Sequence, residues 1–183
     1  MSVAIQETFP SGRYDRLGGR PNNGLGSGAY TATLAFYSQT YFRLPNGRIL
    51  RTRLNLSQGL SSGVTVEDVS VYGTQDGFRG HAKPGSSSFI DSSWEYSLTR
   101  SWALALDVTY RHGRSTHVTG YAGDPTSAPI TLDSGSSEAF GLAPALEYSW
   151  TSSMGVLLGT RFVVAGRNTA ATVTPAVAIN IVR

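Results

Sequence analysis

Residues 102–111, with the sequence WALALDVTYR, decide the fold class because two alternating series of side chains run through them. One series is apolar and begins and ends with the aromatic residues Trp102 and Tyr110, whereas the other is small or polar and ends with Arg111. This period of two predicts a β-strand with one apolar face and one polar face. A strand of about ten residues with aromatic ends is typical of a protein that crosses an outer membrane as a β-barrel.

The same alternation recurs along the chain and predicts about eight strands. The predicted strands are residues 3–8, 30–44, 50–57, 90–98, 102–111, 140–150, 156–164 and 173–181. Pro144 and Pro175 lie inside two of them. Because proline has no N–H to donate, each proline predicts a bulge or a place where the neighbouring strand needs no donor.

The connections between these strands alternate between short and long. Short turns are predicted at residues 45–47, 99–101 and 151–153, and long segments rich in Gly and Ser at 9–28, 59–85 and 115–137. Within 59–85, residues 64–66 and 69–72 are able to form an extra hairpin beyond the membrane. Short turns at one end and long loops at the other predict an antiparallel up-and-down transmembrane β-barrel, with residues 1–183 as its single domain.

Composition excludes other classes of protein. Of the 183 residues, 40% are hydrophobic, and no apolar run approaches the roughly 18 residues of a spanning helix, which excludes a helical membrane protein. Cysteine is absent, so disulfides and thiolate metal sites are excluded. The net charge of +3 comes from dispersed basic residues, so no nucleic-acid partner is predicted. The first residues show no signal peptide, and we expect a mature form or a part of a longer protein.

Four short motifs resemble those of a family of outer-membrane transporters, the MetA-pathway-of-phenol-degradation-like family. They are Pro-Ser-Gly-Arg-Tyr-Asp at 10–15, Tyr-Gly-Thr at 72–74, Gly-Phe-Arg-Gly at 77–80 and Trp-Glu-Tyr-Ser-Leu at 94–98. The resemblance implies a barrel in the bacterial outer membrane that takes up aromatic or other hydrophobic compounds. It also implies that this chain is the C-terminal part of a barrel of roughly a dozen strands.

The lipid bilayer and the barrel assembly machinery are therefore the expected partners. Outer-membrane barrels commonly end in an aromatic residue that this machinery reads, whereas residues 181–183 are Ile-Val-Arg. Either the machinery reads a looser signal here, or the barrel interpretation is weakened.

Charged residues on the predicted polar faces are the candidates for lining a lumen and setting its selectivity. They are Arg51, Arg53, Asp91, Glu95, Asp107, Arg111, Glu147 and Arg161. In an eight-stranded barrel, whose interior is only wide enough for side chains or one small ligand, they would mostly pair with one another as a polar plug. In a twelve-stranded barrel, the same residues would line a pore.

Aromatic residues divide into two groups by position. Those in the predicted strands or beside short turns are expected to form belts at the membrane interface; these are Trp94, Trp102, Tyr110, Tyr148 and Trp150, of which Trp94 lies farthest from its strand end. Those in the long loops are candidates for capturing a hydrophobic substrate at the mouth, namely Tyr72, Phe78 and Tyr121.

No catalytic constellation or cofactor motif is recognisable, so an enzyme is not predicted. The three histidines are His81, His112 and His117, and none has a serine and a carboxylate at a recognisable spacing. His112 and His117 with Asp107 or Asp124 lack a standard metal-ligand spacing, so no metal is predicted. The glycine clusters lack the lysine and the strand–loop–helix context of a phosphate-binding loop, so no cofactor is expected.

Three functions follow from the sequence. The first is an outer-membrane channel for passive uptake of small hydrophobic or aromatic compounds. The second is a plugged barrel with a structural or loop-mediated binding role. The third is a soluble, lipocalin-like binding barrel, in which the apolar faces would point inward; it leaves the aromatic strand ends and the unequal loops unexplained.

Overall fold

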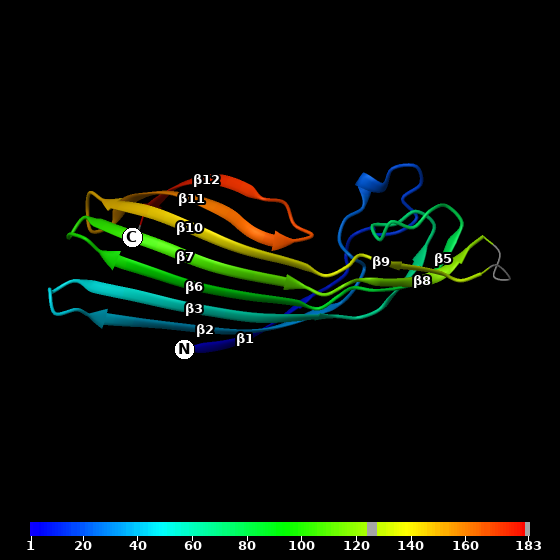
Figure 1. Cartoon of the computed structure of the whole chain (residues 1–183), viewed down its shortest axis with the longest axis horizontal. Helices are drawn as coiled ribbons and strands as arrows, with labels where there is room; N and C mark the ends of the chain where they lie inside the picture. Colours follow the sequence, from blue (N-terminus) through cyan, green and yellow to red (C-terminus); the bar gives the residue numbers. More distant parts are fainter. Residues whose placement is uncertain (124–127, 182–183) are drawn as a thin grey trace.

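The computed structural model describes residues 1–123 and 128–181, and their regular secondary structure is almost entirely β-strand (Figure 1). The strands are β1 (Ser2–Thr8), β2 (Thr31–Arg43), β3 (Ile49–Ser61), β4 (Val64–Glu67), β5 (Phe78–Lys83), β6 (Ser87–Ser97), β7 (Trp102–Gly113), β8 (His117–Ala122), β9 (Ile130–Asp133), β10 (Ser137–Ser149), β11 (Met154–Arg167) and β12 (Thr172–Ile181). The one helical segment in these ranges is a 3-10 turn, Pro21–Asn23. No helix among the described residues is long and apolar enough to span a membrane.

The strands form two antiparallel sheets. The main sheet has eight strands in the order β1-β2-β3-β6-β7-β10-β11-β12, and the small sheet has four in the order β4-β5-β8-β9. All eight strands predicted from the alternation are present in the main sheet, so that prediction is confirmed. Strands adjacent in the main sheet also follow one another in sequence once the strands of the small sheet are set aside, which is an up-and-down arrangement.

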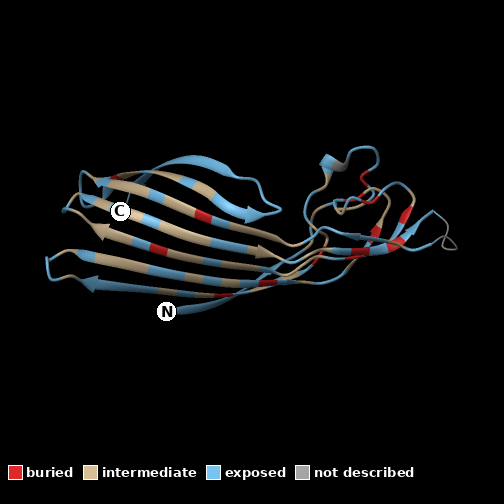
Figure 2. Ribbon diagram, in the orientation of Figure 1, coloured by how far each residue is buried: buried red, intermediate tan, exposed pale blue. Residues whose placement is uncertain are grey.

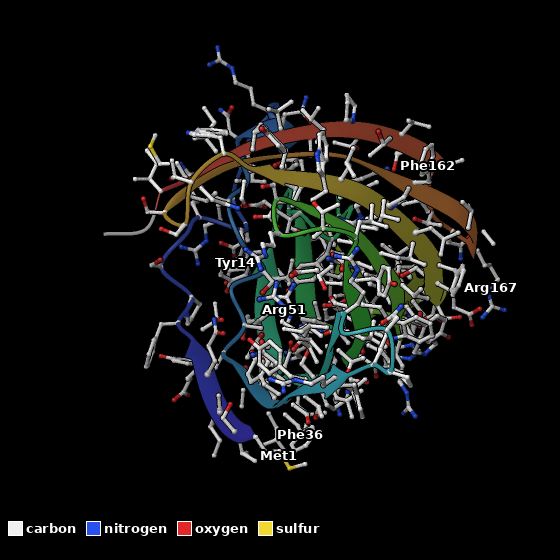
Figure 3. The ribbon with its side chains drawn as sticks, turned by 90° about the vertical axis from the view of Figure 1, so that its left-hand side faces the viewer. Met1, Tyr14, Phe36, Arg51, Phe162 and Arg167 are labelled. Carbon is white, nitrogen blue, oxygen red and sulfur yellow. The ribbon has the colours of Figure 1, made fainter. Side chains whose placement is uncertain are left out.

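The main sheet is curved and open. Viewed along its strands, it bends around a hollow, with β1 and β12 at its two ends (Figure 3). Within the described residues neither of these strands pairs with another strand along its outer edge. The eight antiparallel strands expected from the sequence are present, but among the described residues the sheet does not close into a barrel.

The curvature places the two alternating faces on opposite sides of the main sheet. Arg51 is in register with Tyr41 of β2 and with Glu95 of β6, so these three side chains share one face. In Figure 3, Arg51 lies within the hollow, whereas Phe36 and Phe162, which belong to the other face, lie on the outer side. The polar face therefore lines the hollow, and the apolar face points outward.

No other part of the described chain covers the outward apolar face. Leu104, Leu158 and Val177 are 46%, 52% and 71% exposed, and Trp94 is 54% exposed. Figure 2 shows the buried residues gathered in the small sheet and only isolated ones along the main strands. Globular proteins that work in water seldom leave so large an apolar surface exposed without a partner for it.

The three short turns at 45–47, 99–101 and 151–153 and the long connections lie at opposite ends of the main sheet, as the sequence predicted (Figure 1). The exception, also expected from the sequence at 166–168, is the short connection between β11 and β12, which lies at the end of the long ones. Each short turn is closed by a backbone hydrogen bond, from Leu44 N to Arg48 O (2.9 Å), Leu98 N to Trp102 O (2.9 Å) and Trp150 N to Met154 O (3.1 Å). The N-terminal segment and the two long excursions that hold the small sheet lie at the other end.

The two prolines behave differently in the ladder. Pro144 is in register with Leu106 of β7, but toward β11 the register passes from Leu142 directly to Ala145, so Pro144 has no partner there. This confirms the expected gap at Pro144, and a bulge lies nearby at Phe140–Gly141. Pro175 lies in the edge strand β12, opposite Thr160.

The long excursions are more ordered than the sequence predicted. Residues 64–67 do form a strand, but β4 pairs with β5, so the predicted hairpin partner 69–72 was wrong. The segment 115–137, expected as a loop, contains β8 and β9, and its residues 124–127 lie outside the described part. Strand β8 was missed because Gly120 and Ala122 occupy positions where large apolar side chains would mark an inward face, and β9 because it has only four residues.

The small sheet has a core of its own. Val66, Phe78, Ala82 and Val118 are at most 2% exposed and pack together. Tyr14, Val64, Tyr72 and Ile130 pack against this cluster and are partly buried.

Two glycines face each other beneath this core. A Cβ on Gly80 would lie 2.9 Å from the tip of the Phe78 ring, and one on Gly120 would lie 2.6 Å from it. The absence of side chains at both positions leaves space for the Phe78 ring.

The N-terminal segment is attached to the small sheet by the motif at 10–15 and the residues that follow it. Tyr14 Oη donates to the carbonyl of Thr65 (2.8 Å), and Arg16 N donates to the carbonyl of Glu67 (3.1 Å). The Arg16 guanidinium also forms an ion pair with the Glu67 carboxylate at 2.5 Å. Because the guanidinium is hydrogen-bonded to Glu67, the pKa of Arg16 is raised further. Tyr14 and Arg16 therefore hold the N-terminal segment against β4.

We predict that Gly120→Val destabilises the small sheet by about 1–3 kcal/mol, because overpacking a filled core costs this much. The new Cβ would lie 2.3 Å from the Arg79 carbonyl oxygen as well as against the Phe78 ring. Hydrogen exchange of the β5 and β8 amides, in chain folded in non-ionic micelles, measures the loss. Gly63→Ala is the control, since its Cβ meets nothing nearer than 3.7 Å. Equal protection in both variants would contradict the role given to Gly120.

Candidate functional site

The hollow of the main sheet is the candidate site, because polar residues of neighbouring strands face it. The alternation of the strands supplies these side chains, and the register brings them together. On β6, for instance, Asp91, Ser93 and Glu95 face the hollow, while Ser92 and Trp94 point outward. Ser93 is only 6% exposed, which shows how closely the polar face is packed in the middle of the sheet.

One ion pair occupies the turn end of the hollow. The Arg51 guanidinium contacts the Glu95 carboxylate across the β3–β6 ladder, with their side chains 29% and 25% exposed. Arg51 Nε is buried and has no hydrogen-bond partner among the described residues. Arg51 therefore retains a donor that neither Glu95 nor its other described neighbours satisfy.

A cavity of about 510 Å³ adjoins this ion pair. Arg51 and Glu95 line one side of it, and Glu147, Ser149 and Asn180 line the other. Asn180 Nδ2 donates to Glu147 Oε1 at 3.1 Å, which connects β12 to β10 across β11. Polar groups of β3, β6, β10 and β12 thus line a single cavity.

The remaining charges in the hollow are not paired with one another. Asp91 accepts from Asn55 Nδ2 at 2.8 Å, and the Arg111 guanidinium lies 4.7 Å from the centre of the Phe89 ring. Arg53, Asp107 and Arg161 form no ion pair with a described residue; they lie in register with Ser93 (both Arg53 and Asp107) and Thr174. Of the ion-pair network expected for a plugged eight-stranded barrel, only the Arg51–Glu95 pair is present among the described residues. Amide side chains donate hydrogen bonds to two of the other carboxylates.

The three loop aromatics do not form a single patch. Phe78 is 2% exposed inside the core of the small sheet, so its assignment as a substrate-capture residue is corrected. Tyr72 is partly buried and donates its hydroxyl to the carbonyl of Ser27, and burial raises the pKa of Tyr72. Tyr121 is 39% exposed on β8.

A signal for the burial of Phe78 was present in the sequence. Residues 78–83 alternate Phe, Gly and Ala with Arg, His and Lys, which is the pattern of a half-buried strand. It was missed because glycine and alanine contribute little apolar weight to such a pattern.

Four of the predicted belt aromatics lie near the ends of the outer face. Trp102 and Tyr148 pack at the turn end with ring centres 4.5 Å apart, Trp150 follows in the adjacent turn, and Tyr110 lies toward the loop end. Trp94 lies three residues from the end of β6, in register with Leu106 of β7, and is farther from the turn end than Trp102 and Tyr148. Its place in a belt stays a prediction.

Two of the three histidines lie beside a carboxylate. His112 lies 3.7 Å from Glu138, and His117 contacts Asp133. No group of three or more His, Asp or Glu side chains among the described residues is placed to hold a metal ion. Asp124, considered above as a ligand, lies outside them.

No protein-family model matches this chain, and a comparison with curated proteins found no match either. The resemblance to the outer-membrane transporter family therefore remains a prediction based on the motifs quoted above.

We predict that Arg51→Met lowers the free energy of unfolding by about 1–3 kcal/mol, because Glu95 loses its charged partner in the hollow. Adding Glu95→Gln to that variant should restore part of the loss, since no unpaired charge then remains. Thermal unfolding in non-ionic micelles measures both variants. Arg53→Gln is the control, because Arg53 has no charged partner among the described residues. Strictly additive effects of the two substitutions would show that the pair contributes no coupling.

Proposed function

We propose that this chain forms the wall of a β-barrel in the bacterial outer membrane and allows passive uptake of small hydrophobic or aromatic compounds. The observation that carries the proposal is the orientation of the two faces of the main sheet. The apolar face points outward and is exposed along eight strands, while charged and amide side chains face the hollow. The hydrocarbon core of a bilayer would cover the apolar face, and water or substrate would occupy the hollow.

The orientation argues against the soluble, lipocalin-like alternative. A binder of that kind needs its apolar side chains inside, where they would contact the ligand, and its polar side chains in water. Here Arg51, Asp91 and Glu95 occupy the inner face, and Leu104 and Leu158 the outer one.

Strand direction is compatible with closure. Because the eight strands of the main sheet are antiparallel in turn, β1 and β12 run in opposite directions, and a direct β1–β12 pairing would be antiparallel. Additional strands between them would give the wider, roughly twelve-stranded barrel implied by the resemblance. The wider barrel suits a pore better, since eight strands leave little free interior.

A plugged barrel with a structural or binding role is the second candidate. The observation that favours it is the Arg51–Glu95 pair next to the Glu147–Asn180 contact, because together they place four polar side chains around one end of the hollow. The two candidates differ in conductance. A channel gives stable open steps in a planar bilayer, whereas a plugged barrel folds in the same bilayer and stays silent.

The proposed orientation predicts opposite results for two neighbouring lysine substitutions. Leu106→Lys places a charge on the outer face near the middle of the sheet, where lipid contact costs about 2–4 kcal/mol. Ala105→Lys places the same charge in the hollow. There the ammonium group is hydrated and lies in register with the oppositely charged Glu95. We expect Leu106→Lys to reduce folding into phosphatidylcholine vesicles, and Ala105→Lys to fold nearly as the parent chain does.

Heat-modifiable gel mobility and protease protection in the vesicles measure folding. Equal folding of the two variants would contradict the proposal that the outer face contacts lipid. Stable folding of the parent chain in buffer without detergent or lipid would overturn the membrane proposal as a whole.

A further inference from the structure

Two chain segments cross side by side where the main sheet passes into the small sheet. We call residues 84–86 and 114–116, which connect β5 to β6 and β7 to β8, the neck (Figure 1). Arg114 N donates to Ser86 O at 2.9 Å, and Gly85 N donates to Thr116 Oγ1 at 3.3 Å. A Cβ on Gly85 would lie 1.9 Å from the Arg114 carbonyl oxygen, so only glycine permits this approach. The neck therefore holds its flanking side chains in fixed positions.

Basic side chains gather next to this crossing. Lys83 and His117 lie directly opposite each other on β5 and β8, and His81 lies on the same face, opposite Thr119. Directly opposite residues on one face have Cβ atoms about 4.5–5.5 Å apart. Lys83, Arg114 and His117 line a cavity of about 560 Å³ at the neck. Lys83 and His117 also line an adjoining cavity of about 340 Å³, together with His81.

The positive charge of these cavities is largely uncompensated. Every charged residue that lines them is basic, and the other polar side chains there are hydroxyls. Lys83 and Arg114 form no ion pair with any residue of the described ranges, whereas His117 contacts Asp133 outside the lining. Asp133, in register with His117 on β9, compensates the imidazole when it is charged, so the uncompensated charges at the neck are those of Lys83 and Arg114. A bound anion would compensate them.

We propose that the neck binds a phosphate group, with Lys83 and Arg114 as its charged partners and the hydroxyls of Ser86 and Ser115 as further donors. Phosphate fits because its oxygens accept from several donors at once, and because arginine and lysine are the usual protein partners of that group. The cavity at the neck has the size of a small-molecule site. The phosphate belongs either to a soluble compound or to the headgroup of an amphiphile at the membrane surface. The inference does not depend on transport through the hollow.

The test uses the full chain folded in maltoside micelles at constant ionic strength, with chloride as the balancing ion. Inorganic phosphate is the soluble probe, and dihexanoyl phosphatidic acid, added to the micelles, is the amphiphile probe. Amide NMR shifts of residues 83–87 and 113–117 report binding. Saturable shifts with either probe are expected, and the probe that saturates at lower concentration identifies the source of the phosphate. Lys83→Gln with Arg114→Gln should weaken binding at least about tenfold, because two charge-assisted contacts are lost.

Arg100→Gln is the matched control, since it removes one exposed positive charge at the far, turn end of the sheet and should leave binding unchanged. The single variant Lys83→Gln, at an exposed position, should bind the phosphate probe with an affinity between those of the parent chain and the double variant. Unchanged amide shifts elsewhere in the spectrum show that each variant is folded. The proposal is overturned if neither probe gives saturable shifts at the neck. It is also overturned if the double variant binds as well as Arg100→Gln does.

Discussion

The hydrogen-bonded register of the main sheet is the constraint on which the rest of the structure depends. Successive side chains of a strand point to opposite faces, so the pairing of each strand decides which residues enter the hollow. A slip of one residue between β3 and β6 would separate Arg51 from Glu95 and bring leucines into the hollow. The gap at Pro144 and the nearby bulge interrupt the ladder between β10 and β11 without changing the side on which the charged residues lie.

The two sheets treat their apolar residues in opposite ways. The small sheet buries Val66, Phe78 and Val118 in a core that the N-terminal segment helps to cover. The main sheet leaves its leucines and valines exposed on the convex side, where the membrane proposed above would cover them. The neck, where Gly85 lies against Arg114, joins a part that packs around its own core to a part whose apolar face is exposed.

The charges of the protein are distributed accordingly. In the hollow, Arg51 and Glu95 neutralise each other, and Asn55 and Asn180 satisfy two further carboxylates, so polar contacts rather than ion pairs dominate there. At the neck, Lys83 and Arg114 have no acidic partner in the described chain. The first arrangement suits a lining that lets a neutral compound pass, and the second suits the retention of an anion.

The sequence by itself determined the eight main strands, their alternating faces, the short turns at one end and the set of residues that face the hollow. It could do so because period-two alternation is a local property, written in neighbouring residues such as 102–111. Only the tertiary structure decided that residues 64–67, 78–83, 117–122 and 130–133 form a second sheet and that Phe78 is buried. It also decided that Lys83 and Arg114 line one cavity. These features depend on contacts between segments far apart in the chain, and no local pattern specifies which distant strand becomes a neighbour.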